Sequence, residues 1–170
     1  FVDLQQGRAI YVGDYRTLNI SDCVFSGIIP SDNHSEGSVV FLSGGHNELN
    51  LSGCLFYDNQ ALSQSGEHYG LIYAYNAYET VNMDHCTFYD NGGEGSIAFY
   101  DNSTSTPKWL NVTNSIFYSD IISAPNTNID ITYSLIYETV GEGNFYNDPL
   151  FCDVDSSDFT LYNNSPCAGT

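Results

Sequence analysis

Residues Leu18–Phe25 read LNISDCVF, and residues Leu49–Phe56 read LNLSGCLF. The pattern returns without gaps in Val81–Phe88, Leu110–Phe117 and Ile129–Ile136. The five copies begin 31, 32, 29 and 19 residues apart. Recurrence at such a spacing is typical of repeat architectures, so this repeat decides the fold class.

A second set of segments, each led by glycine and continued by apolar or aromatic residues, precedes the first four copies. These segments are Gly7–Val12, Gly37–Leu42, Gly70–Tyr75 and Gly95–Tyr100. Within the first copy, Leu18 and Ile20 alternate with Asn19 and Ser21. Alternation of this kind predicts two or three short strands in each unit and no helix.

A unit of about 30 residues with short strands cannot bury its own apolar face, whereas stacked units bury it and pair every strand. We therefore predict an all-β fold, a right-handed parallel β-helix (solenoid) of about five rungs over residues 1–147. Residues 148–170 break the pattern and are predicted to form an irregular cap over the C-terminal end of the stack. The Trp-Asp signature of propellers and the helical segment of leucine-rich repeats are both missing.

Equivalent residues of the copies should form columns along the stack. The predicted inward columns are aromatic (Phe25, Phe56, Phe88, Phe117, Ile136), aliphatic (Leu18, Leu49, Val81, Leu110, Ile129) and small (Cys23, Cys54, Cys86, Ser115, Ser134). A predicted outward column consists of Asn19, Asn50, Asn82, Asn111 and Asp130.

Two short motifs recur in the copies, FYDN at Phe56–Asn59 and Phe88–Asn91 and a glycine-led element at Gly7–Ile10 and Gly95–Ala98. They resemble the Phe-x-x-Asn and Gly-Gly-Ala-Ile elements of the chlamydial polymorphic outer-membrane protein repeats. The ending Asp148–Cys167 is similar to the closing segment of many secreted bacterial β-helix proteins. These resemblances imply a β-helix used for surface display, for adhesion or as a passive stalk. They imply no single chemistry, because β-helices also carry polysaccharide-degrading enzymes.

The charge balance excludes several partners. The chain has 21 acidic residues and three basic ones, which gives a formal net charge of −18. Three cations cannot neutralise a nucleic-acid backbone, and anionic membranes and acidic polysaccharides are repelled. No apolar stretch is long enough for membrane insertion. The regular placement of 10 Phe and 14 Tyr argues against disorder.

The five cysteines leave at least one thiol unpaired within the chain, and none has a zinc-site spacing. We predict a disulfide between Cys152 and Cys167, whose loop would contribute about 3 kcal/mol. Cys23, Cys54 and Cys86 are predicted to form a thiol ladder, although a bridge between neighbouring rungs stays open.

Six sequons mark predicted N-glycosylation sites, provided that the source organism glycosylates asparagine. They begin at Asn19, Asn33, Asn50, Asn102, Asn111 and Asn163. Without glycosylation, the aligned members form a plain asparagine ladder.

A tyrosine follows the inward aromatic or isoleucine residue in four copies: Tyr57, Tyr89, Tyr118 and Tyr137. This column predicts an exposed aromatic ladder that stacks on sugars or on another subunit, unless loops cover it.

Asp153, Asp155 and Asp158 alternate in the manner that calcium ligands favour, which makes them a weak calcium candidate. An acidic turn within the cap is the competing interpretation. No other cofactor is expected.

No catalytic residue is predicted. Asp22, Asp84 and His85 lie near one bend of the repeat on rungs one and three, but Gly53 occupies the intervening rung. Adjacent rungs therefore offer no carboxylate pair of the kind that glycoside hydrolases use.

These observations predict a non-catalytic structural or adhesive module, extracellular or at the cell surface. The open first rung, which includes Phe1–Gln6, favours self-association into a filament or stalk, or joining to an upstream domain. The alternatives are a carbohydrate-binding module and a polysaccharide-active hydrolase or lyase.

Overall fold

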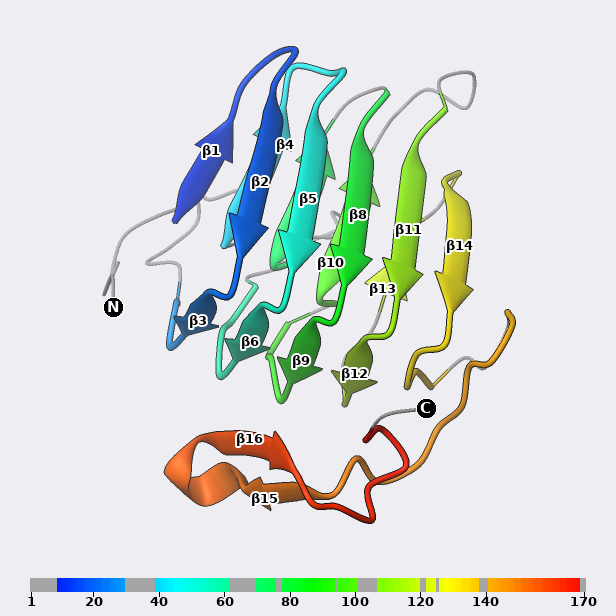
Figure 1. Ribbon diagram of the computed structural model, residues 1–170. Helices are drawn as coiled ribbons and strands as arrows, with labels where there is room; N and C mark the ends of the chain where they lie inside the picture. Colours follow the sequence, from blue (N-terminus) through cyan, green and yellow to red (C-terminus); the bar gives the residue numbers. More distant parts are fainter. Residues whose placement is uncertain are drawn as a thin grey trace.

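The computed structural model describes residues 9–29, 39–61, 70–75, 78–93, 95–100, 107–119, 122–124, 126–137 and 141–168. In these residues the chain forms three parallel sheets and one antiparallel hairpin (Figure 1). Each of the first four rungs passes once through every sheet, the fifth adds a strand to the first two sheets, and the chain advances along the stack in a right-handed sense. The prediction of an all-β parallel β-helix is confirmed.

The strands of the three sheets follow one another regularly in the sequence. The first sheet contains β1 (Ile10–Val12), β4 (Val40–Ser43), β7 (Ile72–Tyr75), β10 (Ile97–Tyr100) and β13 (Ile122–Ser123). The second contains β2 (Thr17–Ser21), β5 (Glu48–Ser52), β8 (Thr80–Asp84), β11 (Trp109–Thr113) and β14 (Asn128–Thr132). The third contains β3 (Val24–Ser26), β6 (Leu55–Tyr57), β9 (Thr87–Tyr89) and β12 (Ile116–Tyr118). The hairpin pairs β15 (Phe151–Asp153) with β16 (Asp158–Leu161) across a short 3-10 turn, η1 (Val154–Ser156).

The register stacks like residues on like residues, as the repeat predicts. Leu49 pairs with Leu18 and Val81 in the second sheet, and Phe56 pairs with Phe25 and Phe88 in the third. The phenylalanine rings stack through the core with centroids 4.5–4.8 Å apart. Their burial and mutual packing make this column a main source of stability.

The Phe-x-x-Asn motif has a clear structural role at the bend after the third sheet. The Asn59 side chain, which is buried, donates to the carbonyl of Phe25 at 2.9 Å and accepts from the backbone of Ile28 at 3.1 Å. Asn91 repeats the first contact one rung later, on the carbonyl of Phe56 at 3.0 Å. The phenylalanine of the motif therefore packs in the core, and its asparagine hydrogen-bonds to backbone C=O and N–H groups at the corner.

Three columns of residues in the left-handed backbone conformation turn the chain at the corners of each rung. The described members, with φ from 49° to 65°, are Tyr15, His46, Tyr78 and Asn126; Asp22, Gly53, His85, Asn114 and Tyr133; and Gly27, Asp58, Asp90 and Ser119. Asn, Asp and Gly tolerate this conformation best, which explains their abundance between the strands.

The small column also adopts its predicted place. Cys54 and Cys86 are buried, and the Ser115 hydroxyl accepts from the Cys86 backbone at 3.1 Å. The Cys54–Cys86 hydrogen bond, followed by burial, raises the pKa of the Cys86 thiol. A raised pKa keeps this thiol protonated and unreactive.

The predicted Cys152–Cys167 disulfide is wrong, because both thiols are free. Cys152 lies at an irregularity of the hairpin, between the Phe151–Leu161 and Asp153–Asp158 pairs. The turn that carries Cys167 is attached elsewhere, because the Ser165 hydroxyl donates to the Pro149 carbonyl and accepts from the Cys167 backbone.

The C-terminal part covers the stack differently from the predicted cap. The end of the last rung is covered by 141–146, where Phe145 bridges to Leu135 and accepts from the Ile136 backbone at 2.9 Å. The hairpin instead lies along the side of the stack, beneath the third sheet in Figure 1. Its two strands already pair with each other, and its aromatic residues pack on the tyrosine column of that sheet.

Candidate binding groove

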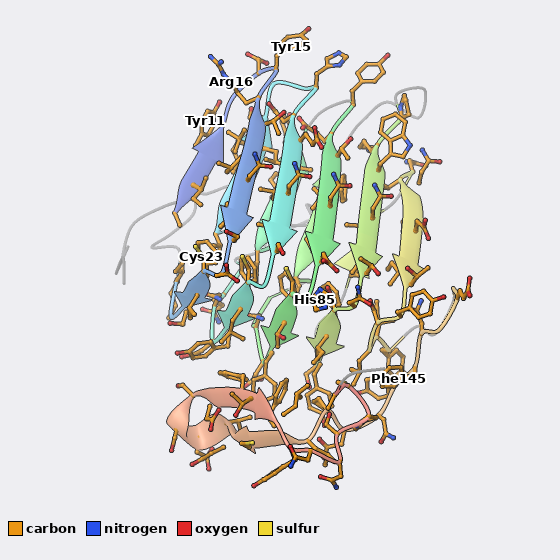
Figure 2. All side chains as sticks on the ribbon, viewed as in Figure 1. Tyr11, Tyr15, Arg16, Cys23, His85 and Phe145 are labelled. Carbon is orange, nitrogen blue, oxygen red and sulfur yellow. The ribbon has the colours of Figure 1, made fainter. Side chains whose placement is uncertain are left out.

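An open groove of about 510 Å³ crosses all five strands of the second sheet on its outward face. Its central column is the predicted outward one: Asn19, Asn50, Asn82, Asn111 and Asp130. Figure 2 shows polar side chains standing along the outward face of this sheet, which faces the viewer. The groove therefore presents the same side chain on successive rungs.

The asparagine amides form one continuous hydrogen-bonded ladder. Asn50 donates to Asn19 at 2.9 Å, Asn82 donates to Asn50 at 2.7 Å, and Asn111 donates to Asn82 at 2.7 Å. All three bonds run in the same direction, so the amide dipoles align and strengthen one another. The ladder fixes the orientation of every amide in the groove.

Two further outward columns flank the ladder. One consists of Ser21, Ser52, Asp84, Thr113 and Thr132, and the other consists of Thr17, Glu48, Thr80, Trp109 and Asn128. Most of these side chains are uncharged hydrogen-bonding groups. Among the residues that the structure describes, no lysine or arginine lines the groove.

Asp84 is one of two carboxylates that line the groove, and it has two side-chain partners. It accepts from Asn114 at 2.9 Å and contacts the His85 ring nitrogen at 2.9 Å. Burial opposes ionisation, but the hydrogen bonds from Asn114 and His85 prevail and lower the pKa of Asp84. Its in-register neighbours are Ser52 and Thr113, so this column brings no second carboxylate to the adjacent rungs.

An exposed aromatic stack stands at the corner that precedes the second sheet, and we call it the aromatic rim. Tyr15, His46 and Tyr78 stack in order, with ring centroids 4.9 and 4.4 Å apart and planes within 10°. Tyr15 is labelled above β2 in Figure 2 and is 72% exposed. Trp109, at the start of β11, is 38% exposed. Sequence analysis missed this rim, although one signal was present: its members stand three residues before Leu18, Leu49 and Val81.

Below the rim lies a buried polar corner. The Glu79 carboxylate accepts from the backbones of Gly45 and Asn47, at 3.1 and 3.0 Å, and from the Asn47 amide at 3.2 Å. Burial is the main cause that raises the pKa of Glu79 to about 7, against the lowering effect of these donors. This corner ties β5 to β8 next to the rim, and sequence analysis missed it.

The predicted exposed tyrosine ladder is largely covered. Tyr57 packs on Phe159 at 4.8 Å, and Tyr89 packs on Phe159 at 5.3 Å and on Phe151 at 5.6 Å. Tyr118 stacks on Tyr146 at 6.3 Å. Only Tyr137 is strongly exposed, at 74%. The hairpin therefore fills the surface on which sugar stacking was expected.

The calcium candidate does not form a cluster. Asp153 accepts from the Ser156 backbone at 3.3 Å, and Asp158 accepts from the Thr160 backbone at 3.0 Å. Among the described residues, no group of three His, Cys, Asp or Glu side chains is placed to hold a metal ion. These aspartates cap the turn of the hairpin.

The sequons occupy two kinds of place. Asn19, Asn50 and Asn111 belong to the ladder, where their amides serve as hydrogen-bond partners. Asn163 lies exposed in the turn after β16. Asn33 and Asn102 lie outside the described residues.

Comparison with known proteins gives no relative. No protein-family model matches the chain, and no curated protein and no solved structure match it either. Fold and groove together place the chain in the class of parallel β-solenoids. None of the described helices is long and apolar enough to cross a membrane.

Proposed function

We propose that the protein is a non-catalytic, extracellular adhesive module that holds an extended polymer across its rungs. The observation that carries this proposal is the continuous asparagine ladder along the open groove of the second sheet. A site that repeats one side chain on successive rungs is complementary to a ligand that also repeats. The resemblance to the chlamydial polymorphic outer-membrane protein repeats supports surface display or adhesion.

Trp109 offers a direct test, because it is the single tryptophan of the chain and borders the groove. The protein should be titrated with neutral polysaccharides, acidic polysaccharides and a fibrous protein such as gelatin. We expect at least one class to change the Trp109 emission and to co-sediment with the protein without being cleaved. If no class binds, the adhesive proposal fails.

The enzyme alternative rests on Asp84, which is held ionised by Asn114 and His85. Reducing ends should be measured after incubation with the same polysaccharides. Turnover that disappears in Asp84→Asn would replace the adhesive proposal with a polysaccharide-active enzyme.

Self-association is a second candidate function. The unpaired strand edges and the half-buried apolar side chains of the first described rung favour it. Among the described residues, no strand pairs with the outer edges of β1, β2 and β3. Leu18 and Ile20 are only half-buried there, whereas Leu49 and Leu51, their equivalents on the next rung, are buried. Sedimentation velocity should show concentration-dependent association that Ile20→Lys abolishes, and a monomer at every concentration would exclude it.

Glycosylation also remains a proposal. Asn163 is the sequon best placed for it, because it is exposed and lies outside the ladder. Intact mass of the protein from its natural source, before and after glycosidase treatment, decides whether any sequon is occupied.

A further inference from the structure

We propose that the ligand of the groove is an uncharged, unbranched polysaccharide that lies parallel to the solenoid axis, over the asparagine ladder and beside the aromatic rim. This inference rests on the proposed adhesive function and names the ligand class. Five features of the groove and its border point to it: the free hydrogen-bonding capacity of the ladder, the axial spacing, the neighbouring charges, the paired backbone and the aromatic rim.

The ladder leaves hydrogen-bonding capacity that suits hydroxyl groups. An asparagine amide has two N–H donors and two acceptor lone pairs. Asn50 uses one N–H for Asn19 and one lone pair for Asn82, so one donor and one acceptor remain for a ligand. A sugar hydroxyl is both donor and acceptor, and it can satisfy such a pair on one rung.

The spacing repeats along the axis of the stack. Strands of a sheet lie about 4.8 Å apart, so the ladder offers an equivalent amide at each such step. Beside it, hydroxyls stand on adjacent rungs at Ser21 and Ser52 and again at Thr113 and Thr132, with Asp84 on the rung between the two pairs. A polymer with short, repeating units can therefore make the same contacts on several rungs, and its affinity rises with the number of rungs engaged.

Charge selects against acidic chains. Asp84 and Asp130 line the groove, and in the described part of the chain no basic residue does; the net charge of the chain is −18. Uronate and sulfated polymers would be repelled by this field. Uncharged sugars are not repelled, and their vicinal hydroxyls are good hydrogen-bond donors to carboxylates.

The backbone of the sheet excludes a peptide strand as occupant. Peptides that extend a sheet bind to an edge, where N–H and C=O groups are unpaired. Here the groove lies on the face of β5, β8 and β11, and their backbone groups pair with neighbouring rungs on both sides. Recognition from this face depends on side chains alone.

The aromatic rim offers exposed ring edges and outer ring faces next to the second sheet. Tyr78 is exposed and begins the approach to β8, two residues before Thr80. Tyr15, His46 and Tyr78 occupy left-handed backbone positions, which cost energy for residues with a side chain. The same conformation recurs at the other corners of the rungs, so it is the exposure and stacking of these three rings that support a binding role.

The test is calorimetric titration with xylo-, manno- and mixed-linkage gluco-oligosaccharides of increasing length, with polygalacturonate and gelatin in parallel. We expect binding of at least one neutral series, with affinity that increases with length up to about five rungs. Asn82→Ala and Tyr78→Ala should each weaken it at least tenfold. Tyr137→Ala is the control, because Tyr137 is exposed in the bend after the last rung, outside the second sheet and its rim.

Each outcome is decisive. Binding of polygalacturonate or gelatin that Asn82→Ala weakens would overturn the ligand class while the adhesive function stands. Neutral binding that neither Asn82→Ala nor Tyr78→Ala changes would overturn this site, provided that circular dichroism shows both variants folded. Absence of any binding would sink the site and the adhesive function together.

Discussion

The amide nitrogen of Asn82 lies 2.7 Å from the side-chain oxygen of Asn50, one rung before it, and the Asn82 oxygen accepts from Asn111 at the same distance. Asn82 thus makes two ladder bonds, whereas Asn19 at the first rung makes one. A ladder on an outward face holds the rungs in register where no hydrophobic core can do so.

The first prediction compares these two positions. Asn82→Ala removes the two ladder bonds and a longer hydrogen bond to Glu48 at 3.4 Å, and it should lower the free energy of unfolding by about 1–2 kcal/mol. Asn19→Ala removes one and should cost about half as much. Urea denaturation measures both, and equal effects would mean that the ladder adds little.

The second prediction concerns the aromatic core. Phe88 is fully buried and stacks on Phe56 at 4.5 Å and on Phe117 at 4.7 Å. Phe88→Ala should cost about 3–5 kcal/mol, because it removes a large side chain and leaves a cavity. Phe25→Ala is the matched control, since Phe25 is half-buried and stacks on one ring only. A smaller loss for Phe88 than for Phe25 would contradict the stacked core.

The third prediction concerns pH. Burial raises the pKa of Glu79 from 4.5 to about 7, so the folded protein holds this proton more tightly than the unfolded chain does. The stabilising contribution is complete below about pH 4.5 and is lost as the pH rises toward about 7. The midpoint temperature of thermal unfolding should therefore fall with rising pH across this window, and it should fall more steeply for the wild type than for Glu79→Gln.

Repulsion among the acidic residues of a chain with net charge −18 also lowers stability as the pH rises. The informative quantity is therefore the difference in pH dependence between the wild type and Glu79→Gln. Parallel pH profiles would show that Glu79 does not titrate in this window.

The fourth prediction concerns the hairpin. The Tyr57 hydroxyl is hydrogen-bonded to Ser157 in the hairpin and to Ser26, which lowers the pKa of Tyr57. Phe159 joins the hairpin to both Tyr57 and Tyr89. Because a lone two-stranded hairpin is only marginally stable, Phe159→Ala should release it from the third sheet. Limited proteolysis should then cut between 147 and 168 while the rungs stay intact, and unchanged resistance would refute the docking.

The fifth prediction concerns the thiols. All five cysteines are free, and Cys54 and Cys86 are buried. The denatured, unreduced protein should react with five equivalents of iodoacetamide, and the folded protein should protect Cys54 and Cys86. An adduct count of three after denaturation would indicate one disulfide.

The repeat was sufficient to predict the rungs, because copies such as Leu18–Phe25 and Leu49–Phe56 align without gaps and period-two alternation assigns each residue to a face. It could not predict the position of the hairpin, because packing of Phe151 and Phe159 on the third sheet leaves no periodic signal. The expected Cys152–Cys167 disulfide failed for a similar reason, since proximity in sequence does not fix the two turns in space.

The sequence predicted one part of the candidate site, the asparagine column, and missed the other, the aromatic rim. The outward asparagine column follows from alternation, and its hydrogen bonds follow from the in-register stacking. The stack of Tyr15, His46 and Tyr78 involves corner residues, where side-chain direction depends on a left-handed backbone that alternation does not describe. The covered tyrosine column shows the converse, because outward residues of a rung become half-buried when another segment docks on them.

The most direct measurement is an NMR titration that follows the side-chain NH₂ signals of the asparagines as a neutral oligosaccharide is added. The account predicts that the signals of Asn50, Asn82 and Asn111 shift together with the Trp109 indole signal. Shifts confined to residues outside the second sheet and its rim, or no shifts at saturating concentrations of every neutral series, would contradict it.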